Sequence, residues 1–180
     1  MALKRRVGAS AEQILAVQGN LANAYKALGR NEHALGMRRD VYSELVRLHG
    51  EGHFESLREA FNYANDLLDL KRCGEAKSFL HKEIPVAQRI LGEIHDITLS
   101  MRSIYAEALY RAYVYRAEGA TLDDVREAVE TYEDAARIAR RVFGNTHPLT
   151  TEIERNLRIA RAALQIALRL RETPPESTMR

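Results

Sequence analysis

Three histidines recur at similar points of this 180-residue chain and are its first candidates for chemistry. His53 lies in HGEGHFESL, His95 in LGEIHDITL and His147 in FGNTHPLTT, so the successive spacings are 42 and 52 residues. Imidazoles can bind zinc, but a shared ion needs every ligand at about 2.0–2.2 Å. Histidines that open successive units of a repeat lie too far apart for that geometry. We therefore interpret them as structural residues of the turns between repeats and expect no metal site.

No other residues have the types and spacing of a catalytic or cofactor-binding site. There is no glycine-rich loop of the kind that cradles phosphate, and no nucleophile, base and orienting group stand at an interpretable spacing. Cys73 is the single cysteine, which excludes an intrachain disulfide, a C-x-x-C redox pair and a cysteine-rich zinc site. The sequence predicts a protein that is not an enzyme and binds no cofactor.

Charge and hydropathy narrow the class further. The 27 Lys and Arg residues are nearly balanced by 25 Asp and Glu, and a net charge of +2 argues against a dedicated nucleic-acid-binding protein. No stretch approaches about 18 consecutive apolar residues, and Lys4, Arg5 and Arg6 are not followed by the apolar core of a signal peptide. We expect a cytoplasmic protein that does not contact a membrane.

The histidine spacing is part of a longer internal repeat. A shift of 42 residues places Asn20 on Asn62, Ala22 on Ala64, Leu28 on Leu70, Ala34 on Ala76 and Gly50 on Gly92. The next unit aligns only after ten residues are inserted between 109 and 122, where we expect one helix to lengthen before a turn. A repeat of this length is typical of arrays of paired helices.

Apolar residues within each unit recur with a helical period. Stripes at i, i+4 and i+7 are formed by Leu21, Tyr25 and Leu28 and by Tyr63, Leu67 and Leu70. Because no alternation of period two is sustained, we predict an all-α fold with helices near 11–29, 31–48, 57–71, 74–91, 99–117, 122–143 and 151–171. We expect Pro85 to kink or break the fourth helix.

Helix-start signals and the apolar stripes complete the predicted architecture. Capping boxes are formed by Ser10 with Gln13, Ser56 with Glu59, Thr121 with Asp124 and Thr151 with Glu154. The predicted core between repeats contains Leu21, Tyr25, Tyr63, Leu67, Tyr105, Leu109 and Leu157.

The segment LANAYKALGRNEHAL, residues 21–35, resembles the first helix and turn of a tetratricopeptide repeat. The family's characteristic positions are occupied by Leu21, Ala22, Tyr25, Gly29 and Ala34. The 42-residue period and the junction formed by Gly144, His147, Pro148 and Thr150 are similar to kinesin-light-chain-type repeats. The resemblance implies helical hairpins stacked into a right-handed α-solenoid. It does not imply a motor function, because the chain lacks the heptad coiled coil that would bind a kinesin heavy chain.

The repeat register also predicts the domain boundaries. Lys4, Arg5, Val7 and Gly8 align with Arg140, Arg141, Phe143 and Gly144, near the end of a second helix. We therefore predict a remnant of a preceding helix at 1–8, repeats at 9–52, 53–94 and 95–146 with the insertion near 109–122, a capping helix at 147–172 and a disordered tail at 173–180.

In tetratricopeptide arrays the first helices of the units line a concave groove, so the resemblance implies a protein-binding surface. The residues predicted for it are Asn23, Lys26, Arg58, Phe61, Asn65, Glu107, Tyr110, Arg111 and Arg155. The aromatic residues would contact an apolar anchor, the asparagines would bond to peptide backbone and the arginines would pair with carboxylates. The predicted function is a scaffold that binds an extended acidic peptide or a partner helix.

Other binding roles follow from the same resemblance. Some tetratricopeptide modules clamp a terminal carboxylate, and Asn23 and Asn62 match the asparagines of that clamp. Gly19, Ser100 and Ile104 stand where its basic residues should be, so this specificity is not expected. Two alternatives stay open: assembly into homo-oligomers through the ends of the array, and a regulatory repeat domain within a larger protein.

Overall fold

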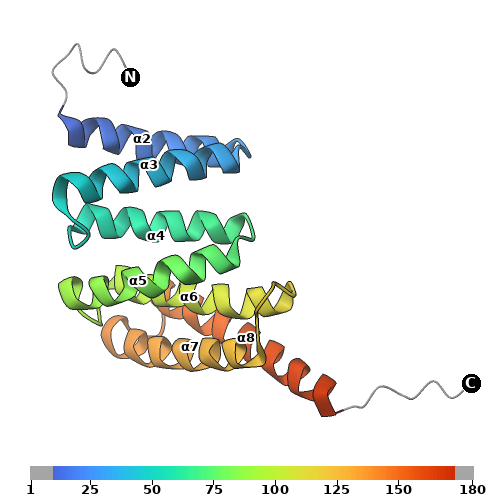
Figure 1. The fold of residues 1–180 in the computed structure, drawn as a ribbon. Coiled ribbons are helices and arrows are strands. Elements are labelled where there is room, and N and C mark those ends of the chain that lie inside the picture. The colour runs from blue at the N-terminus through green and yellow to red at the C-terminus, as the bar shows by residue number, and fades with distance from the viewer. Residues whose placement is uncertain (1–9, 173–180) are drawn as a thin grey trace, which may run out of the picture. The chain divides into compact units, whose positions relative to one another are not determined.

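A computed structural model describes residues 10–172, and every regular element in that range is a helix (Figure 1). The helices are α2 (Ala11–Ala27), α3 (Asn31–His49), α4 (Phe54–Asp69), α5 (Cys73–Leu91), α6 (Asp96–Val114), α7 (Leu122–Phe143) and α8 (Pro148–Glu172). The predicted all-α helical-repeat class is thus confirmed. The remnant at 1–8 and the tail at 173–180 lie outside the described residues. The chain divides within α6 into two compact units, unit 1 through Met101 and unit 2 from Arg102.

The repeat histidines cap the starts of three helices. α4, α6 and α8 begin directly after His53, His95 and His147. In each case the imidazole Nδ1 accepts a hydrogen bond from the backbone N–H two residues later, at 3.3, 3.2 and 3.2 Å respectively. The first N–H groups of a helix lack partners within the helix, so this bond satisfies one of them. The imidazole takes the part that serine or aspartate plays at most helix starts.

The glycine three residues before each histidine ends the preceding helix. Gly50, Gly92 and Gly144 have φ of 89°, 90° and 85°, a region that side chains disfavour. Their N–H groups still donate to the helix carbonyl four residues earlier, at 2.8, 3.0 and 3.1 Å. The Gly-x-x-His pattern is therefore a compact junction in which glycine ends one helix and histidine starts the next.

This junction explains which predicted capping boxes are wrong. The boxes at Ser10 and Thr121 are confirmed, with reciprocal side-chain and backbone bonds. Ser56 and Thr151 instead lie inside α4 and α8, because the histidine three or four residues earlier already caps the helix. The three helices that follow a histidine consequently begin three residues earlier than predicted.

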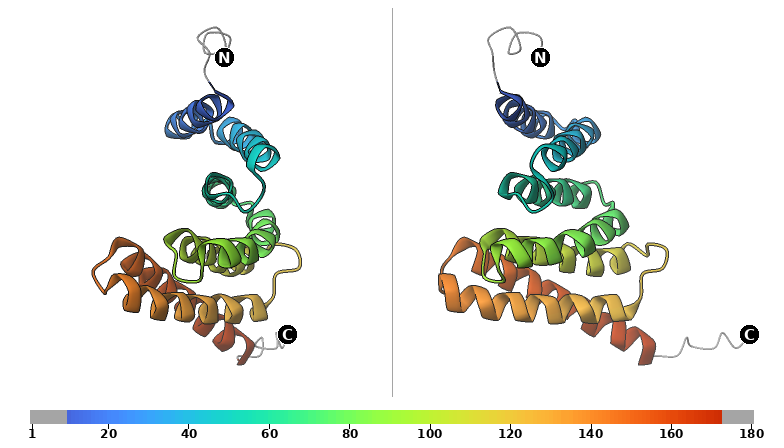
Figure 2. Two further views of the ribbon diagram at one scale, coloured as in Figure 1. Left: turned by 90° about the vertical axis from the view of Figure 1, so that its left-hand side faces the viewer. Right: turned by 60° about the vertical axis from the view of Figure 1, so that its left-hand side comes forward.

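Small residues let the helices of unit 1 approach closely. α2 packs on α3, α3 on α4 and α4 on α5 (Figures 1 and 2). Ala22, Ala34, Ala60, Ala64 and Ala76 are all buried at these contacts. The helix continues through Pro85, which does not break α5 and occupies an exposed position. In unit 2, α7 contributes an alanine-rich buried face and packs on α8.

The predicted core is only partly buried. Leu67, Tyr105, Leu109 and Leu157 are buried as predicted, whereas Tyr25 and Tyr63 are half-buried. Leu21, by contrast, is exposed, as is its stripe neighbour Leu28, because no helix within residues 10–172 covers that face of α2. The stripe was correctly assigned to one helix face, but that face is not part of the core.

The segment in which the sequence predicts an insertion contains the end of α6 and the turn that follows it. α6 has 19 residues against 16 in α4, and a turn with positive φ at Arg116 and Gly119 leads into α7. Among the described helices, none is long and apolar enough to cross a membrane.

Candidate partner-binding surface

The nine predicted groove residues are divided between the two units. Unit 1 contains Asn23, Lys26, Arg58, Phe61 and Asn65, and unit 2 contains Glu107, Tyr110, Arg111 and Arg155. A single groove formed by all nine therefore stays a prediction, and each unit is described by itself.

Unit 1 has a hollow of about 780 Å³ lined by α2, α3 and the first half of α4. Its apolar side is a buried cluster of Leu15 from α2 with Val41 and Leu45 from α3. Its polar lining consists of Glu12, Gln13, Asn20, Asn23, Arg38, His49, His53, Glu55, Arg58, Glu59 and Asn62. This larger hollow offers an apolar floor surrounded by amides and charges.

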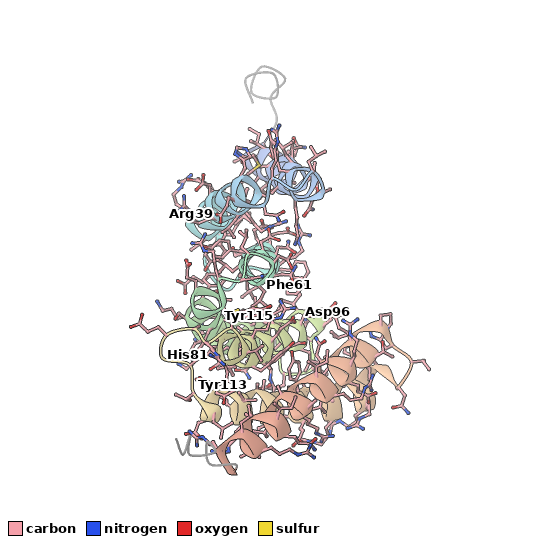
Figure 3. The ribbon with its side chains drawn as sticks, turned by 90° about the vertical axis from the view of Figure 1, so that its right-hand side faces the viewer. Arg39, Phe61, His81, Asp96, Tyr113 and Tyr115 are labelled. Atoms are coloured by element: carbon pink, nitrogen blue, oxygen red, sulfur yellow. The ribbon has the colours of Figure 1, made fainter. Side chains whose placement is uncertain are left out.

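A smaller hollow of about 330 Å³ lies beside it, between α4 and the start of α6. It is lined by Phe54, Arg58, Phe61, Asn62, Asp96, Ile97 and Ser100, and Figure 3 labels Phe61 and Asp96. Arg58 and Asn62 line both hollows. The two hollows therefore adjoin, and together they form what we call the α4 surface.

Of the residues predicted to contact a partner, Arg58 and Phe61 lie on the α4 surface in accessible positions. The Arg58 side chain is 49% exposed and is paired with Glu55 in the same helix. Phe61 is half-buried, so part of its ring is open to the smaller hollow. An aromatic edge next to an arginine can receive an apolar group and a carboxylate at neighbouring points.

Asn23 and Lys26 take part in a charge network around the buried Arg38, which the sequence did not single out, although Asn23 itself is exposed at the larger hollow. Arg38 on α3 is 2% exposed, and its Nη2 donates to Asn23 Oδ1 at 2.6 Å. Its Nε donates to Asp66 Oδ2 at 2.6 Å, and its Nη1 donates to Glu59 Oε1 at 3.0 Å. Lys26 Nζ lies 2.6 Å from the other oxygen of Asp66. These groups join α2, α3 and α4, so their first role is structural, and of the two predicted residues only Asn23 is also exposed at the larger hollow.

Lys26 is further satisfied by Asp69, whose carboxylate lies 2.6 Å from Nζ. Burial lowers the pKa of Lys26, but hydrogen bonds and attraction from Asp66 and Asp69 outweigh it, so the pKa is raised above its usual value. Lys26, which the sequence placed on a partner-facing surface, is therefore paired with two carboxylates of its own chain. The sequence contained a signal for this network. Arg38 aligns with Leu80 and Tyr132 in the later repeats, so it is a cation at an otherwise uncharged repeat position. A cation that is buried there requires carboxylates beside it.

The predicted residues of unit 2 are also largely satisfied within the chain. Tyr110 is 7% exposed, so it is not available as a surface anchor. Burial and the charge of Glu107 raise the pKa of the Tyr110 phenol, while its hydrogen bond with Arg111 opposes the rise. Arg111 Nη2 lies 2.9 Å from Glu107 Oε1. Arg155 alone of this set is fully on the surface.

Unit 2 has its own hollow of about 700 Å³ between α7 and α8. Its charged lining comprises Glu130, Glu133, Asp134, Arg137, Arg140, Glu154, Arg158 and Arg161. The signs are balanced, and pairs such as Arg161 with Glu133, at 2.7 Å, neutralise much of the charge. Among residues 10–172, no three His, Cys, Asp or Glu side chains are grouped so that they could hold a metal ion.

Consecutive helix pairs with small residues at their contacts define an all-helical repeat protein. Residues 14–55 and 120–149 match the family model of the tetratricopeptide repeat. Two crystal structures of nearly identical tetratricopeptide-like repeats, from a Podosopora anserina protein described as a kinesin light chain, have a similar fold. One, a substituted form, has a TM-score of 0.73 and 22% identity, covering 95% of this chain and 76% of that one. The other has a TM-score of 0.70 and 21% identity, covering 95% and 77%.

These comparisons confirm the tetratricopeptide repeat fold that the motif residues predicted, and that fold is similar to the repeats of the two Podosopora anserina structures. No curated protein sequence matches this chain significantly. Repeats of this fold generally mediate protein–protein interaction or assembly and are generally non-catalytic.

Proposed function

We propose that this protein is a non-catalytic scaffold that binds an extended segment of a partner protein on the α4 surface. The observation that carries the proposal is that two hollows adjoin at Arg58 and Asn62 of α4. One hollow is lined by α2, α3 and α4 and the other by α4 and the start of α6. An extended chain that follows both hollows would meet an apolar floor, amide groups and an arginine in sequence. The cytoplasmic location remains a prediction of the sequence.

The chemistry of the α4 surface specifies the partner more narrowly than the sequence did. Leu15, Val41 and Leu45 favour one apolar side chain in the larger hollow. Asn20 and Asn62 carry amides suited to the backbone of an extended peptide. Arg58 suits a single carboxylate next to that anchor. Lys26 and Arg111 are withdrawn as contacts because about two thirds of each side chain is buried against the carboxylates that pair with it, whereas Arg58 stays 49% exposed in its pair with Glu55.

The test is to select peptides of about twelve residues that bind the whole protein from a random library, and to measure the affinity of the best one by calorimetry. Phe61→Ala and Arg58→Glu should each weaken binding about tenfold, the loss expected for one apolar contact or one charge-assisted hydrogen bond. Arg39→Glu is the matched control, because Arg39 is an exposed arginine of α3 outside both hollows (Figure 3).

Equal effects of Arg58→Glu and Arg39→Glu would show that only general charge matters and would refute the assignment. The same conclusion would follow if the selected peptides bound both single variants of the α4 surface as tightly as the original protein. Circular dichroism of each variant shows whether the helices are intact.

A further inference from the structure

The smaller hollow of the α4 surface has a charged residue on each of its two sides. Arg58 belongs to α4, and Asp96 is the first residue of α6. The proposed function uses Arg58 and the apolar residues of the hollow but leaves Asp96 without a role. We propose that Asp96 is a specificity-determining residue that binds a lysine or arginine of the partner segment. This inference rests on the proposed function and adds a basic residue to the chemistry of the partner.

The two charges differ in how far this chain neutralises them. Arg58 pairs with Glu55 of the same helix, whereas no lysine or arginine within residues 10–172 pairs with Asp96. With histidines counted as neutral, the imbalance extends over the whole α4 surface, because its two hollows are lined by two arginines and four carboxylates. Apart from Asp96 these residues are Arg38, Arg58, Glu12, Glu55 and Glu59. The charge that the surface leaves uncompensated is therefore negative, and it favours a basic group.

His95 lies next to Asp96 but does not supply the missing cation. Its Nδ1 is 2.8 Å from Asp96 Oδ1, and the same nitrogen accepts the backbone N–H of Ile97 at 3.2 Å. A ring nitrogen that accepts a hydrogen bond has no proton to donate to a carboxylate. The Ile97 N–H also reaches Asp96 Oδ1, at 2.7 Å. One carboxylate oxygen thus serves the start of α6, and the Asp96 side chain remains 64% exposed at the smaller hollow.

The helix junction itself does not require a carboxylate at this position. The residue that follows the capping histidine is Phe54 in α4 and Pro148 in α8. Both helices nevertheless begin with the same imidazole bond as α6, at 3.3 and 3.2 Å. A negative charge near a helix N-terminus is favourable, but that benefit would be available to α4 and α8 as well. Capping alone therefore does not account for Asp96.

Aromatic rings in the smaller hollow suit the stem of a long basic side chain. Phe54 is 44% exposed and Phe61 is half-buried, and both line the hollow with Asp96 (Figure 3). Lysine and arginine can pack their apolar stems on such rings while the charged end stays in water, and a ring face attracts a cation. A basic side chain that crosses Phe54 would bring its charge to Asp96. The partner segment therefore combines a basic residue with the apolar anchor and the carboxylate that Arg58 receives.

The probe is the best peptide selected on the whole protein from the random library, together with a charge-reversed form in which its lysine or arginine is replaced by glutamate. Calorimetry measures both affinities. Asp96→Asn, which can still accept the Ile97 N–H, should weaken the selected peptide about threefold through loss of one exposed ion pair. Asp96→Lys should weaken it about tenfold, because repulsion replaces attraction, and should bind the charge-reversed peptide more tightly than the selected one. Asp40→Lys is the matched control, since Asp40 is a 72% exposed carboxylate of α3 outside both hollows.

Failure of this inference can be told apart from failure of the α4 surface. Selected peptides that need Phe61 and Arg58 but contain no basic residue, or that bind both Asp96 variants as tightly as the original protein, would overturn the role of Asp96 alone. Equal effects of Asp96→Lys and Asp40→Lys would show that only net charge acts, and would overturn it too. Peptides that are insensitive to Phe61→Ala and Arg58→Glu would refute the proposed function and this inference with it. Thermal unfolding followed by circular dichroism shows whether each variant keeps its helices.

Discussion

Removing the cation of Arg38 tests whether the buried charge network holds α2, α3 and α4 together. Arg38→Leu leaves Glu59 without its arginine and Asp66 with Lys26 alone. Breaking a buried ion pair by removing one partner costs about 3–5 kcal/mol. Because Lys26 remains 2.6 Å from Asp66 and Asn62 still donates to Glu59 at 3.2 Å, we expect the lower end, about 3 kcal/mol.

The matched variant replaces Arg38 by the leucine found at the same register in α5, and its two carboxylates by the apolar residues that α8 has in the same register. Glu59 corresponds to Ile153 and Asp66 to Ala160, so the triple variant is Arg38→Leu, Glu59→Ile and Asp66→Ala. Replacing a complete buried ion network by apolar residues is often neutral or stabilising, so the triple variant should recover at least about 2 kcal/mol of the loss. The double variant that keeps Arg38 should be the least stable, since it buries an unpaired cation.

Urea unfolding at neutral pH, followed by far-ultraviolet circular dichroism, measures these free energies. A loss below about 1 kcal/mol for Arg38→Leu would mean that the network contributes little more than a surface ion pair. A triple variant no more stable than Arg38→Leu would contradict the idea that the loss comes from unpaired carboxylates. Either result would refute the structural role assigned to this network.

Three further predictions concern local structure and pH. His53→Ala should lower the free energy of unfolding by about 1 kcal/mol through loss of the α4 cap, and His53→Asn, which can still accept that bond, should lower it less; thermal unfolding decides this. Lys71 has a φ of 59°, where a side chain costs about 1–2 kcal/mol. Lys71→Gly should therefore raise the free energy of unfolding, measured in urea, by up to about 1 kcal/mol. Burial and hydrogen bonds to carboxylates raise the pKa of Tyr42 and of Tyr105 above the unfolded value, so their contribution to stability is complete below about pH 10 and is lost as pH rises above it. Tyr42→Phe should therefore flatten the alkaline fall in stability, and an unchanged pH profile would contradict this.

Much of the fold was predictable because repeat sequences record their own register. The 42-residue shift and the i, i+4, i+7 stripes predicted the number and order of the helices within residues 10–172. The start of α4 was placed three residues late because an imidazole is not one of the usual capping side chains, so Ser56 was preferred over His53. The candidate surface was predicted less well: Arg58 and Phe61 lie on the α4 surface, whereas Tyr110 is buried.

The sequence by itself determined which residues share a helix face, because helical period and capping depend on neighbours within one segment. Tertiary structure alone decided which of those faces are covered. Val17 and Leu21 of α2 are exposed, whereas Ile153 and Leu157 at the same register of α8 are buried, because α7 packs on α8 and no helix within residues 10–172 covers that face of α2. It also decided that Lys26 pairs with Asp66 across 40 residues of sequence, within hydrogen-bonding distance. Burial and pairing depend on segments that are distant in the chain, and one sequence records that proximity only indirectly.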